Sequence, residues 1–318
     1  MKKWFLTALA VMLLAFPFTG AFAADEGDGE FPLLNGDGFL DEGEFLFEDA
    51  DAGVWRYANS TIRVEVLRKE SEKPKEVWYE AEIWCAEGSS DGVRVISANP
   101  EKWAYSEQYP YKLARKTGTV IAMSCDYAGA RVREKSKVGI VIRNGEIKSE
   151  KTYKSGSDHF PNLDILAIYE DGDMKVFESN EKTAEELLEE GAVDVMAFGP
   201  ILIMDGELNE KAIEKYGKST AQRAAVGMAE KGHYFFMMLE GRIDRSKGAG
   251  IHFLAERLLE RGCTVGFNLD GGQTASIVFM GHQLCKMDNK NRNLSSRKAC
   301  DILGAGYSEL LPAVSDPW

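Results

Sequence analysis

A glycine-rich turn after a short apolar run is where we first expect chemistry in this sequence. The run at 264–268 is typical of a buried strand. The turn reads Asn268-Leu269-Asp270-Gly271-Gly272, and hydroxyl groups follow at Thr274 and Ser276. Two glycines let backbone N–H groups converge on an anion without an obstructing Cβ, and Asp270 sets a carboxyl group beside them. A tight turn capped by Asp270 explains the same residues equally well.

Two arginines stand next to other predicted strands. Arg223 immediately precedes the apolar run at 224–228, and Arg242 follows the run at 234–239. The planar guanidinium group offers paired donors that match phosphate oxygens. A lone arginine more often forms an ordinary surface ion pair, so each residue is a candidate for phosphate binding and not by itself a site.

A third candidate segment ends the apolar run at 119–123. Ser124, Cys125, Asp126 and Tyr127 place a carboxyl group and an aromatic ring after this predicted strand. An ordinary loop is the alternative. Cysteine beside an acid also suggests thiol catalysis, but nothing in the sequence pairs any of the four histidines with Cys125, which disfavours that chemistry.

The elements that must position these residues are mainly strands with a few helices. Alternation of apolar and charged residues at 62–66 predicts a half-buried strand, further strands are predicted at 77–85, 93–97 and 193–198, and Asn144-Gly145 and Asp171-Gly172 predict hairpins. Helices are predicted at 106–116, 183–190 and 250–261, the second with a capping box of Thr183 and Glu186. This pattern predicts an α+β fold with a mixed, largely antiparallel β-sheet core and a few flanking helices.

The N-terminal region predicts export of a single domain. Residues 1–24 combine Lys2 and Lys3, an apolar run and a small-residue end, as in a secretory signal peptide, with an uncleaved anchor as the alternative. Eleven acidic residues and no Lys or Arg lie within 25–51, so 25–52 is predicted to be an acidic linker. Residues 53–318 then form the domain, which we expect to be secreted, periplasmic or held at the cell surface, without stable membrane insertion.

Composition narrows the partners and cofactors. The formal net charge is −13, and outside the acidic segment the chain is close to neutral, which argues against a nucleic-acid partner. Five cysteines match no zinc pattern, and any four of them allow three disulfide pairings. We expect no metal and no cofactor. Calcium is a weaker alternative, because Asn35, Asp37, Asp41 and Glu44 have EF-hand spacing but Leu33 occupies the first ligand position.

Taken in order, these segments resemble the bacterial branch of the phosphodiester glycosidase family, from about residue 57 to 307. The segments that carry the resemblance are AMSCDYAGAR at 122–131, VIRNG at 141–145, FGP at 198–200, QRAAVG at 222–227, EGR at 240–242, NLDGGQTAS at 268–276 and SSRKACD at 295–301. The chain departs from the family at Ser124, Cys125 and Gln273, where the family has Asn, Gly and Gly.

The resemblance implies an exported hydrolase that cleaves the glycosidic bond of a sugar-1-phosphodiester. Asp270 is then the leading acid/base or nucleophile candidate, and Asp126 is the second carboxylate. The expected substrate and phosphate contacts are Arg223, Arg242, Gly271, Gly272, Thr274, Ser276, Asn268 and Tyr127. The alternative is a non-catalytic binder of phosphorylated or cell-surface glycans, which the three departures motivate.

Overall fold

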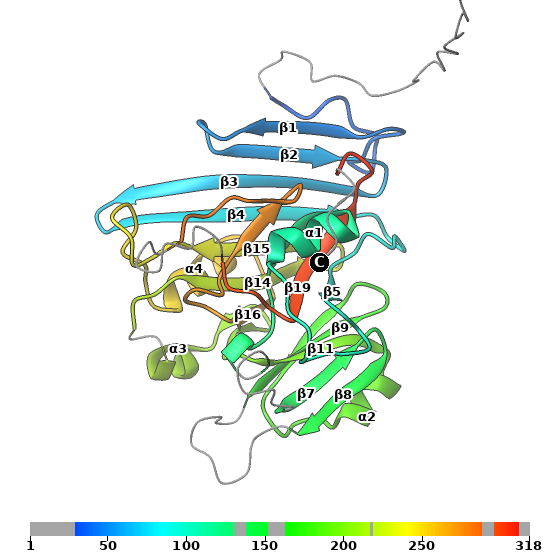
Figure 1. Cartoon of the computed structure of the whole chain (residues 1–318), viewed down its shortest axis with the longest axis vertical. Helices are drawn as coiled ribbons and strands as arrows, with labels where there is room; N and C mark the ends of the chain where they lie inside the picture. Colours follow the sequence, from blue (N-terminus) through cyan, green and yellow to red (C-terminus); the bar gives the residue numbers. More distant parts are fainter. Residues whose placement is uncertain are drawn as a thin grey trace, which may run out of the picture.

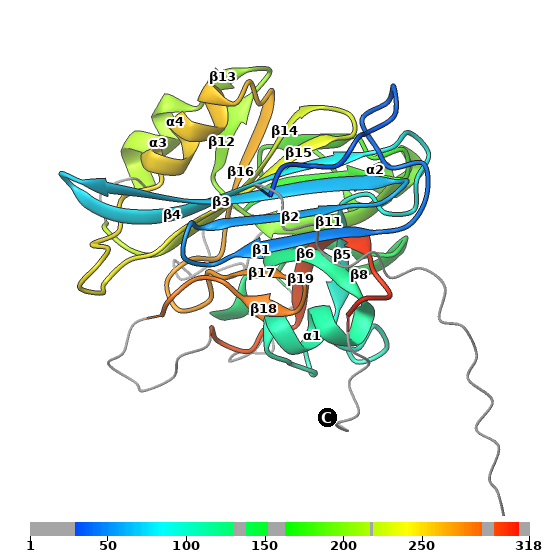
Figure 2. The same ribbon diagram turned by 90° about the horizontal axis from the view of Figure 1, so that it is seen from above.

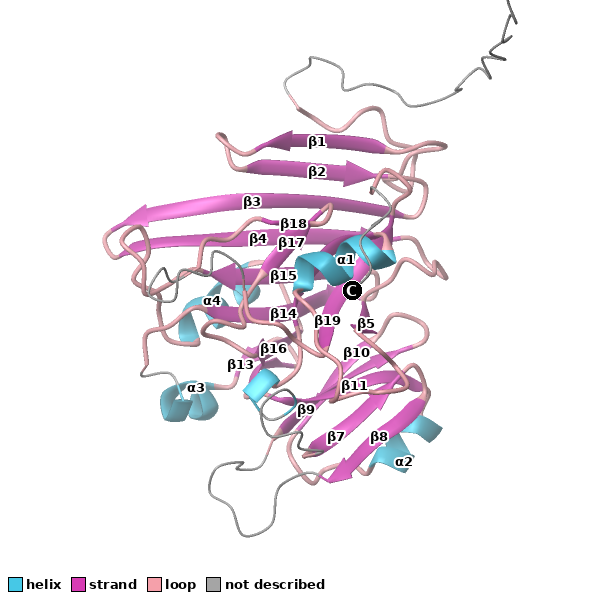
Figure 3. Cartoon of the chain, in the orientation of Figure 1, coloured by secondary structure: helices cyan, strands magenta, loops and turns pink. Residues whose placement is uncertain are grey.

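Three antiparallel sheets make up the fold (Figures 1 and 3). The structure is a computed structural model of the chain, and it describes residues 29–129, 131, 138–151, 163–216, 219–287 and 296–311. Every strand pair recorded in these residues is antiparallel, and four helices flank the sheets. The predicted α+β fold with a largely antiparallel core is therefore confirmed.

The largest sheet, here called the large sheet, has nine strands. Its order is β1 (Phe45–Asp49), β2 (Val54–Ala58), β3 (Ile62–Glu72), β4 (Lys75–Cys85), β15 (His233–Leu239), β14 (Arg223–Glu230), β16 (Val265–Leu269), β12 (Ile201–Met204) and β13 (Glu207–Leu208). β16, which leads into Asp270, is an inner strand between β14 and β12, so the candidate turn starts from the middle of the sheet.

Two five-stranded sheets complete the core. The β6 sheet has the order β18 (His282–Gln283), β17 (Ile277–Phe279), β6 (Thr119–Ser124), β19 (Asp301–Tyr307) and β5 (Arg94–Ser97). The β9 sheet has the order β10 (Met174–Phe177), β9 (Asp164–Tyr169), β11 (Ala192–Phe198), β7 (Gly139–Arg143) and β8 (Glu146–Lys151). Figure 1 places the β9 sheet at the end of the molecule opposite β1 and β2.

The helices cover different sheets. They are α1 (Pro110–Thr117), α2 (Ala184–Glu189), α3 (Glu210–Tyr216) and α4 (His252–Glu260). Figure 2 shows α3 and α4 on one face of the large sheet and the β6 sheet with α1 on the other. α2 packs on the β9 sheet through Leu187. Among the described residues no helix is both long and apolar enough to cross a membrane.

The inner strands of the large sheet are buried on both faces. In β15, Phe235 and Met237 pack with Leu258 of α4, whereas Phe236 and Met238 belong to the core shared with the β6 sheet. Successive side chains of a strand point to opposite faces, so a strand covered on both sides must be apolar at every position. This is why the run at 234–239 shows no alternation.

The local sequence signals are confirmed where they were strongest. Asn144 and Gly145 have φ values of 51° and 74°, as a type I′ turn requires, and they join β7 to β8. The capping box of α2 is present: the Glu186 N–H donates to the Thr183 hydroxyl at 3.2 Å, and the Thr183 N–H donates to the Glu186 carboxylate at 2.8 Å. α1 begins at Pro110, four residues later than predicted, because proline favours the first turn of a helix.

The acidic segment differs from the predicted linker. Phe45 and its neighbours form β1, which pairs with β2 at the edge of the large sheet. The Glu44 carboxylate accepts hydrogen bonds from the Tyr57 hydroxyl at 2.7 Å and from the Ser308 hydroxyl. The many acidic residues made the segment look like a linker, although it contains the apolar residues FLF at 45–47. These apolar residues attach the segment to the domain. The predicted signal peptide at 1–24 lies outside the described residues.

The candidate calcium loop closes on itself. The Asn35 side-chain oxygen accepts the backbone N–H groups of Asp37 at 3.0 Å and Phe39 at 3.1 Å, which stabilises a turn. In the described ranges no group of three or more His, Cys, Asp or Glu residues is arranged to hold a metal ion. Calcium binding stays a prediction. No disulfide joins any of the five cysteines.

A buried ionic network joins the two five-stranded sheets. Arg143, the last residue of β7, donates through Nη2 to Asp126 Oδ2 at 2.7 Å and to Asp301 Oδ2 at 2.8 Å. Arg131 Nε donates to the same Asp126 oxygen at 3.1 Å, and the Trp103 indole N–H donates to Asp301 at 3.0 Å. Two arginines therefore balance two carboxylates that are almost completely buried.

We predict that Arg143→Met strongly destabilises the protein. The substitution keeps the bulk of the side chain but leaves two buried carboxylates without the cation they share, a loss of about 3–5 kcal/mol. Urea unfolding measures it. Lys231→Met is the control, because Lys231 pairs with Asp171 at the surface, where such a pair contributes about 0–1 kcal/mol. Equal unfolding midpoints for the two variants would contradict this role of the network.

Candidate active site

Asp270 is held against the segment that follows β6. One of its carboxylate oxygens accepts the Ala128 N–H at 2.9 Å, and the Thr274 side chain hydrogen-bonds to the same carboxyl group. The Ser124 hydroxyl donates to the Asp270 carbonyl at 3.5 Å. Two segments that are far apart in the sequence, 124–128 and 268–274, thus meet at one carboxyl group.

The environment of Asp270 shifts its titration toward neutral pH. Burial raises the pKa of Asp270 to about 6, against the lowering effects of Ala128, Thr274 and the positive charge of Arg297. An aspartate in water titrates near pH 4. A carboxyl group that changes charge close to neutral pH has the properties of an acid/base or nucleophilic group.

The two glycines of the turn meet different requirements: Gly271 is closely packed, and Gly272 adopts a positive φ of 62°. A Cβ atom on Gly271 would lie 2.8 Å from the Gln222 carbonyl oxygen, so only glycine fits there. The Gly272 N–H donates to that same carbonyl at 3.0 Å. The predicted role of both amides in binding phosphate is therefore reduced to Gly271, whose N–H has no hydrogen bond to the described residues.

The two arginines flank this turn. Arg223 opens β14 and lies against Gly271, with its Cδ 3.9 Å from the position of a Cβ there. Arg242 Nη1 lies 3.9 Å from the corresponding position on Gly272. Arg242 adopts a φ of 59°, a left-handed conformation that costs energy for a side chain of this size, and its side chain is exposed.

Neither arginine of this pair has a counter-charge among the described residues. Arg223 donates to the Ala249 carbonyl at 3.2 Å and to the Ser219 hydroxyl at 2.9 Å, both neutral groups. Burial first, and then the charge of Arg242, lower the pKa of Arg223. No carboxylate in the described part of the chain forms an ion pair with either arginine. Two neighbouring cations without a carboxylate partner attract an anion from solution.

A cavity of about 550 Å³ opens beside the turn. Three of the predicted residues line it: Tyr127, Arg223 and Asn268. The Tyr127 ring packs edge-on against Phe198, with ring centres 4.9 Å apart, and Asn268 Nδ2 donates to the Gly199 carbonyl at 2.8 Å. Asp270 and Arg242 do not line the cavity themselves.

The remaining predicted side chains, Asp126, Thr274 and Ser276, are buried and do not line the cavity. Burial alone would raise the pKa of Asp126, but Arg131 and Arg143 hold it below the usual value, and the Tyr127 N–H donates to Asp126 at 2.6 Å. These contacts favour a positioning role for Asp126. Thr274 and Ser276 are fully buried, and the Thr274 side chain is hydrogen-bonded to Asp270.

Two further residues near the site escaped the sequence analysis. Arg297 donates its backbone N–H to the Gln273 carbonyl at 2.8 Å and reaches the Thr274 hydroxyl at 3.5 Å. It lies within the SSRKACD segment, which was a usable signal. Asp164 lines the cavity as the first residue of β9, and it belongs to no motif.

Of the three departures from the family pattern, two are buried and one is partly exposed. Ser124 and Cys125 are fully buried, and Cys125 Sγ lies 3.9 Å from the Met196 sulfur. Burial raises the pKa of the Cys125 thiol well above its usual value, so thiol catalysis has no support here. Gln273, by contrast, is partly exposed next to Gly272.

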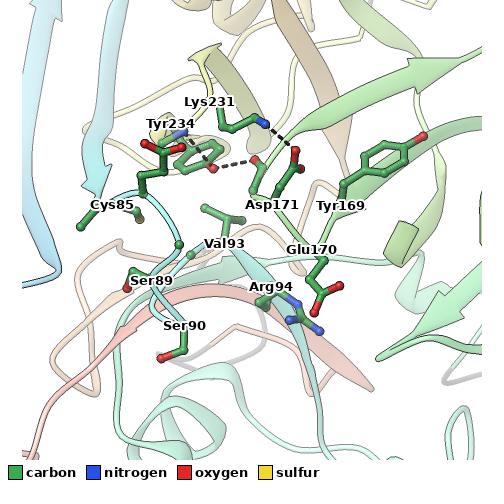
Figure 4. A pocket seen from close by; sticks show the side chains of 16 residues that line it. Cys85, Ser89, Ser90, Val93, Arg94, Tyr169, Glu170, Asp171, Lys231 and Tyr234 are labelled. Atoms are coloured by element: carbon green, nitrogen blue, oxygen red, sulfur yellow. Dashed lines mark hydrogen bonds and ion pairs between the residues drawn. The ribbon is translucent and has the colours of Figure 1, made fainter. Parts of the chain in front are cut away.

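A second cavity of about 580 Å³ lies between the β4–β5, β9–β10 and β14–β15 connections (Figure 4). It contains none of the predicted residues. Lys231 forms an ion pair with Asp171, and the Tyr234 hydroxyl donates to the Gly172 carbonyl at 2.6 Å. The positive charge of Lys231 is thus neutralised by Asp171, whereas Arg223 in the first cavity contacts only neutral groups.

The fold and the site define an α+β protein in which an acidic turn, two neighbouring arginines and a cavity meet beside an inner strand. Residues 117–304 match the family model described as phosphodiester glycosidase. The match covers more than half of the chain, and the chain belongs to the phosphodiester glycosidase family.

Individual relatives are more distant. The SPbeta prophage-derived uncharacterized protein YomE of Bacillus subtilis is 26% identical over 174 residues, which are 54% of this chain and 26% of that protein, so the chain spans about a quarter of it. The zebrafish N-acetylglucosamine-1-phosphodiester alpha-N-acetylglucosaminidase catalytic domain, auto-inhibited by its pro-peptide, shares the fold: TM-score 0.63, 16% identity, covering 78% of this chain and 84% of that one. A hypothetical protein from Synechocystis gives a TM-score of 0.52 and 14% identity, covering 79% and 63%.

We predict that Gly271→Ala disrupts the turn. The new methyl group would meet the backbone of Gln222, which cannot move without separating β14 from β16, and overpacking of this kind costs about 1–3 kcal/mol. Thermal unfolding measures the loss. Gly36→Ala is the control, since a Cβ there has open space. A Gly271→Ala variant as stable as that control would show that the contact is not tight.

We also predict that Arg242→Gln weakens binding of inorganic phosphate. Loss of a charged hydrogen bond of about 1.5–3 kcal/mol corresponds to a roughly 10- to 100-fold rise in Kd. Calorimetry measures it, with Lys112→Gln, an exposed residue of α1, as the charge-matched control. Equal affinities of the two variants would remove Arg242 from the anion site.

Proposed function

We propose that this protein hydrolyses the glycosidic bond of a sugar-1-phosphodiester. The observation that carries the proposal is the arginine pair, Arg223 and Arg242, which flanks the Asp270 turn and has no carboxylate partner in the described part of the chain. A phosphodiester supplies the missing negative charge. The family to which the chain belongs and the name of the zebrafish relative support the same substrate class.

The chemistry follows from the order of the groups along the site. The arginines, with the Gly271 amide, bind the phosphate oxygens and stabilise the charge that develops as this group leaves. The bond between the anomeric carbon and the bridging oxygen breaks, and its electron pair stays with the phosphate. A phosphate leaves readily without a proton donor, so the reaction needs one carboxylate, Asp270, more than a second acid.

Asp270 acts in its ionised form. As a general base it accepts the proton of the attacking water; as a nucleophile it forms a glycosyl ester that water then cleaves. The two routes invert or retain the anomeric configuration, which NMR of the fresh product distinguishes. Asp126, bound by Arg131 and Arg143, supports the reaction by fixing Tyr127 and Ala128.

Export is part of the proposal. The signal-peptide pattern of residues 1–24 supports a secreted, periplasmic or cell-surface location, where sugar phosphodiesters occur in envelope polymers. The partner is thus a carbohydrate or sugar phosphate and no nucleic acid.

The test uses an aryl phosphodiester of a sugar-1-phosphate in ¹⁸O-labelled water. Cleavage of the glycosidic bond places the label on the sugar, whereas cleavage at phosphorus places it on the phosphate. We expect labelled sugar. Label found on phosphate, or no turnover with any of several sugars, would contradict the proposed reaction.

We predict a pH profile governed by Asp270. Because its pKa is about 6, the ionised form predominates above that pH, so kcat/KM should be level above about pH 7 and fall tenfold per unit well below pH 6. Asp270→Asn should reduce kcat by about 10²–10⁴-fold. The same substitution should not lower the thermal midpoint at pH 7, because it removes an unfavourably buried charge. A profile without a break near pH 6 would assign the essential group elsewhere.

A glycan-binding protein without turnover is the second candidate, and the partly exposed Gln273 favours it. Its side chain stands beside the phosphate-binding turn, where the family has no side chain. Gln273→Gly discriminates the two. A large gain in turnover would indicate a protein that has lost activity, whereas unchanged turnover would show that Gln273 is compatible with the reaction.

A further inference from the structure

The loop at 270–276 crosses from one sheet to another. It leaves the large sheet at the end of β16 and enters the β6 sheet at β17. Arg223 and Arg242 lie beside the first half of the loop, at 271–272. The second half is contacted by a third arginine, Arg297, which comes from the segment before β19. Positive charge therefore stands at both ends of the loop that carries Asp270.

The backbone of Arg297 anchors this second half. The Arg297 N–H donates to the Gln273 carbonyl at 2.8 Å, and a side chain of any kind at position 297 would retain this bond. The half-buried guanidinium group makes only a long contact, from Nη1 to the Thr274 hydroxyl at 3.5 Å. The loop is thus held mainly by the backbone, and the charge of the side chain is not needed for that purpose.

The charge of Arg297 is close to Asp270 but is not paired with it. Burial raises the pKa of Asp270, and the positive charge of Arg297 opposes this effect, so the two groups lie near each other. No ion pair joins Arg297 to a carboxylate anywhere in the described ranges. A guanidinium group without such a partner, next to the reacting carboxyl group, attracts an anionic group of a ligand.

The cavity that Arg223 lines carries further basic side chains. Lys211 and Lys215 of α3 line it together with two acids, Asp164 and Glu178. The Asp164 carboxylate already accepts backbone N–H groups. Three basic residues against two acids give the cavity a positive balance, so the part of a substrate that lies beyond the arginines can be anionic as well.

We propose that Arg297 binds a second phosphate group carried by the sugar, so that the substrate is a glycan whose sugars are joined by successive phosphodiesters. In such a polymer each sugar has one phosphate at its anomeric carbon and another on a hydroxyl group. The inference rests on the proposed function: the phosphate that leaves lies at Arg223 and Arg242, the sugar passes Asp270, and the next phosphate reaches Arg297. Arg297 is a specificity-determining residue and takes no part in bond cleavage.

The first experiment uses the unmodified protein. Calorimetry compares glucose-1-phosphate with glucose-1,6-bisphosphate, which differ only in the second phosphate group. A charged hydrogen bond to that group should make the bisphosphate bind roughly 10- to 100-fold more tightly. Equal or weaker binding of the bisphosphate, or no binding of either compound, overturns the proposal.

The second experiment removes the charge. Arg297→Gln keeps the backbone bond to Gln273, and we expect it to abolish the preference for the bisphosphate while inorganic phosphate binds as before. Arg297→Lys keeps the charge and should retain part of the preference. The control is Lys298→Gln, because Lys298 Nζ lies 5.5 Å from the centre of the Tyr109 ring and not at the loop. Thermal unfolding verifies that each variant is folded.

Two results of the second experiment would overturn the role of Arg297. One is an unchanged preference for the bisphosphate in Arg297→Gln. The other is an equal loss of affinity for both sugar phosphates, which would show that Arg297 acts only through the charge of Asp270 or the position of the loop.

The two proposals fail separately. If the bisphosphate is preferred in the expected way but no diester is cleaved, the hydrolase proposal fails and the role of Arg297 stands. If diesters are cleaved while both sugar phosphates bind equally, the role of Arg297 fails and the hydrolase proposal stands.

Discussion

The buried pairing of Arg143 with Asp126 and Asp301 is the interaction on which the rest of the site depends. It connects β7 of one sheet with β19 of another and fixes Asp126 at the end of β6. Once Asp126 is fixed, the Tyr127 ring faces the cavity and the Ala128 N–H reaches Asp270. Charges buried this deeply are tolerated only in complete pairs, so the network tolerates little displacement of the loop that carries these residues.

The distribution of charge separates support from function. Where arginines and carboxylates are paired, as in the network of Arg143, their ion pairs hold the sheets together. Where arginines have no carboxylate partner within the described ranges, as at Arg223 and Arg242, the charge is available to a ligand. Asp270 differs from both groups, because it is surrounded by protein but has no direct ion pair with a described residue. Burial therefore raises its pKa to about 6. The second cavity, with its internal pair of Lys231 and Asp171, shows the contrast.

Several elements were predictable because their causes are local. The Asn144-Gly145 hairpin and the Thr183 capping box each depend on residues within a few positions of one another, and both are confirmed. β1 was missed because its short apolar stretch lies among acids and gains its stability from pairing with β2. β19 was missed for a related reason: its partners, β5 and β6, lie nearly two hundred residues earlier in the chain.

The sequence by itself determined the family, the position of the Asp270 turn and the identity of the two arginines, because each is written in a short contiguous motif. Only the tertiary structure decided what these residues contact. It showed that the Gly272 amide is already bonded, that Asp126 is enclosed by Arg131 and Arg143, and that Asp164 shares the cavity with Tyr127 and Asn268. The physical reason is that hydrogen bonding and burial depend on neighbours in space, and here those neighbours come from three different sheets.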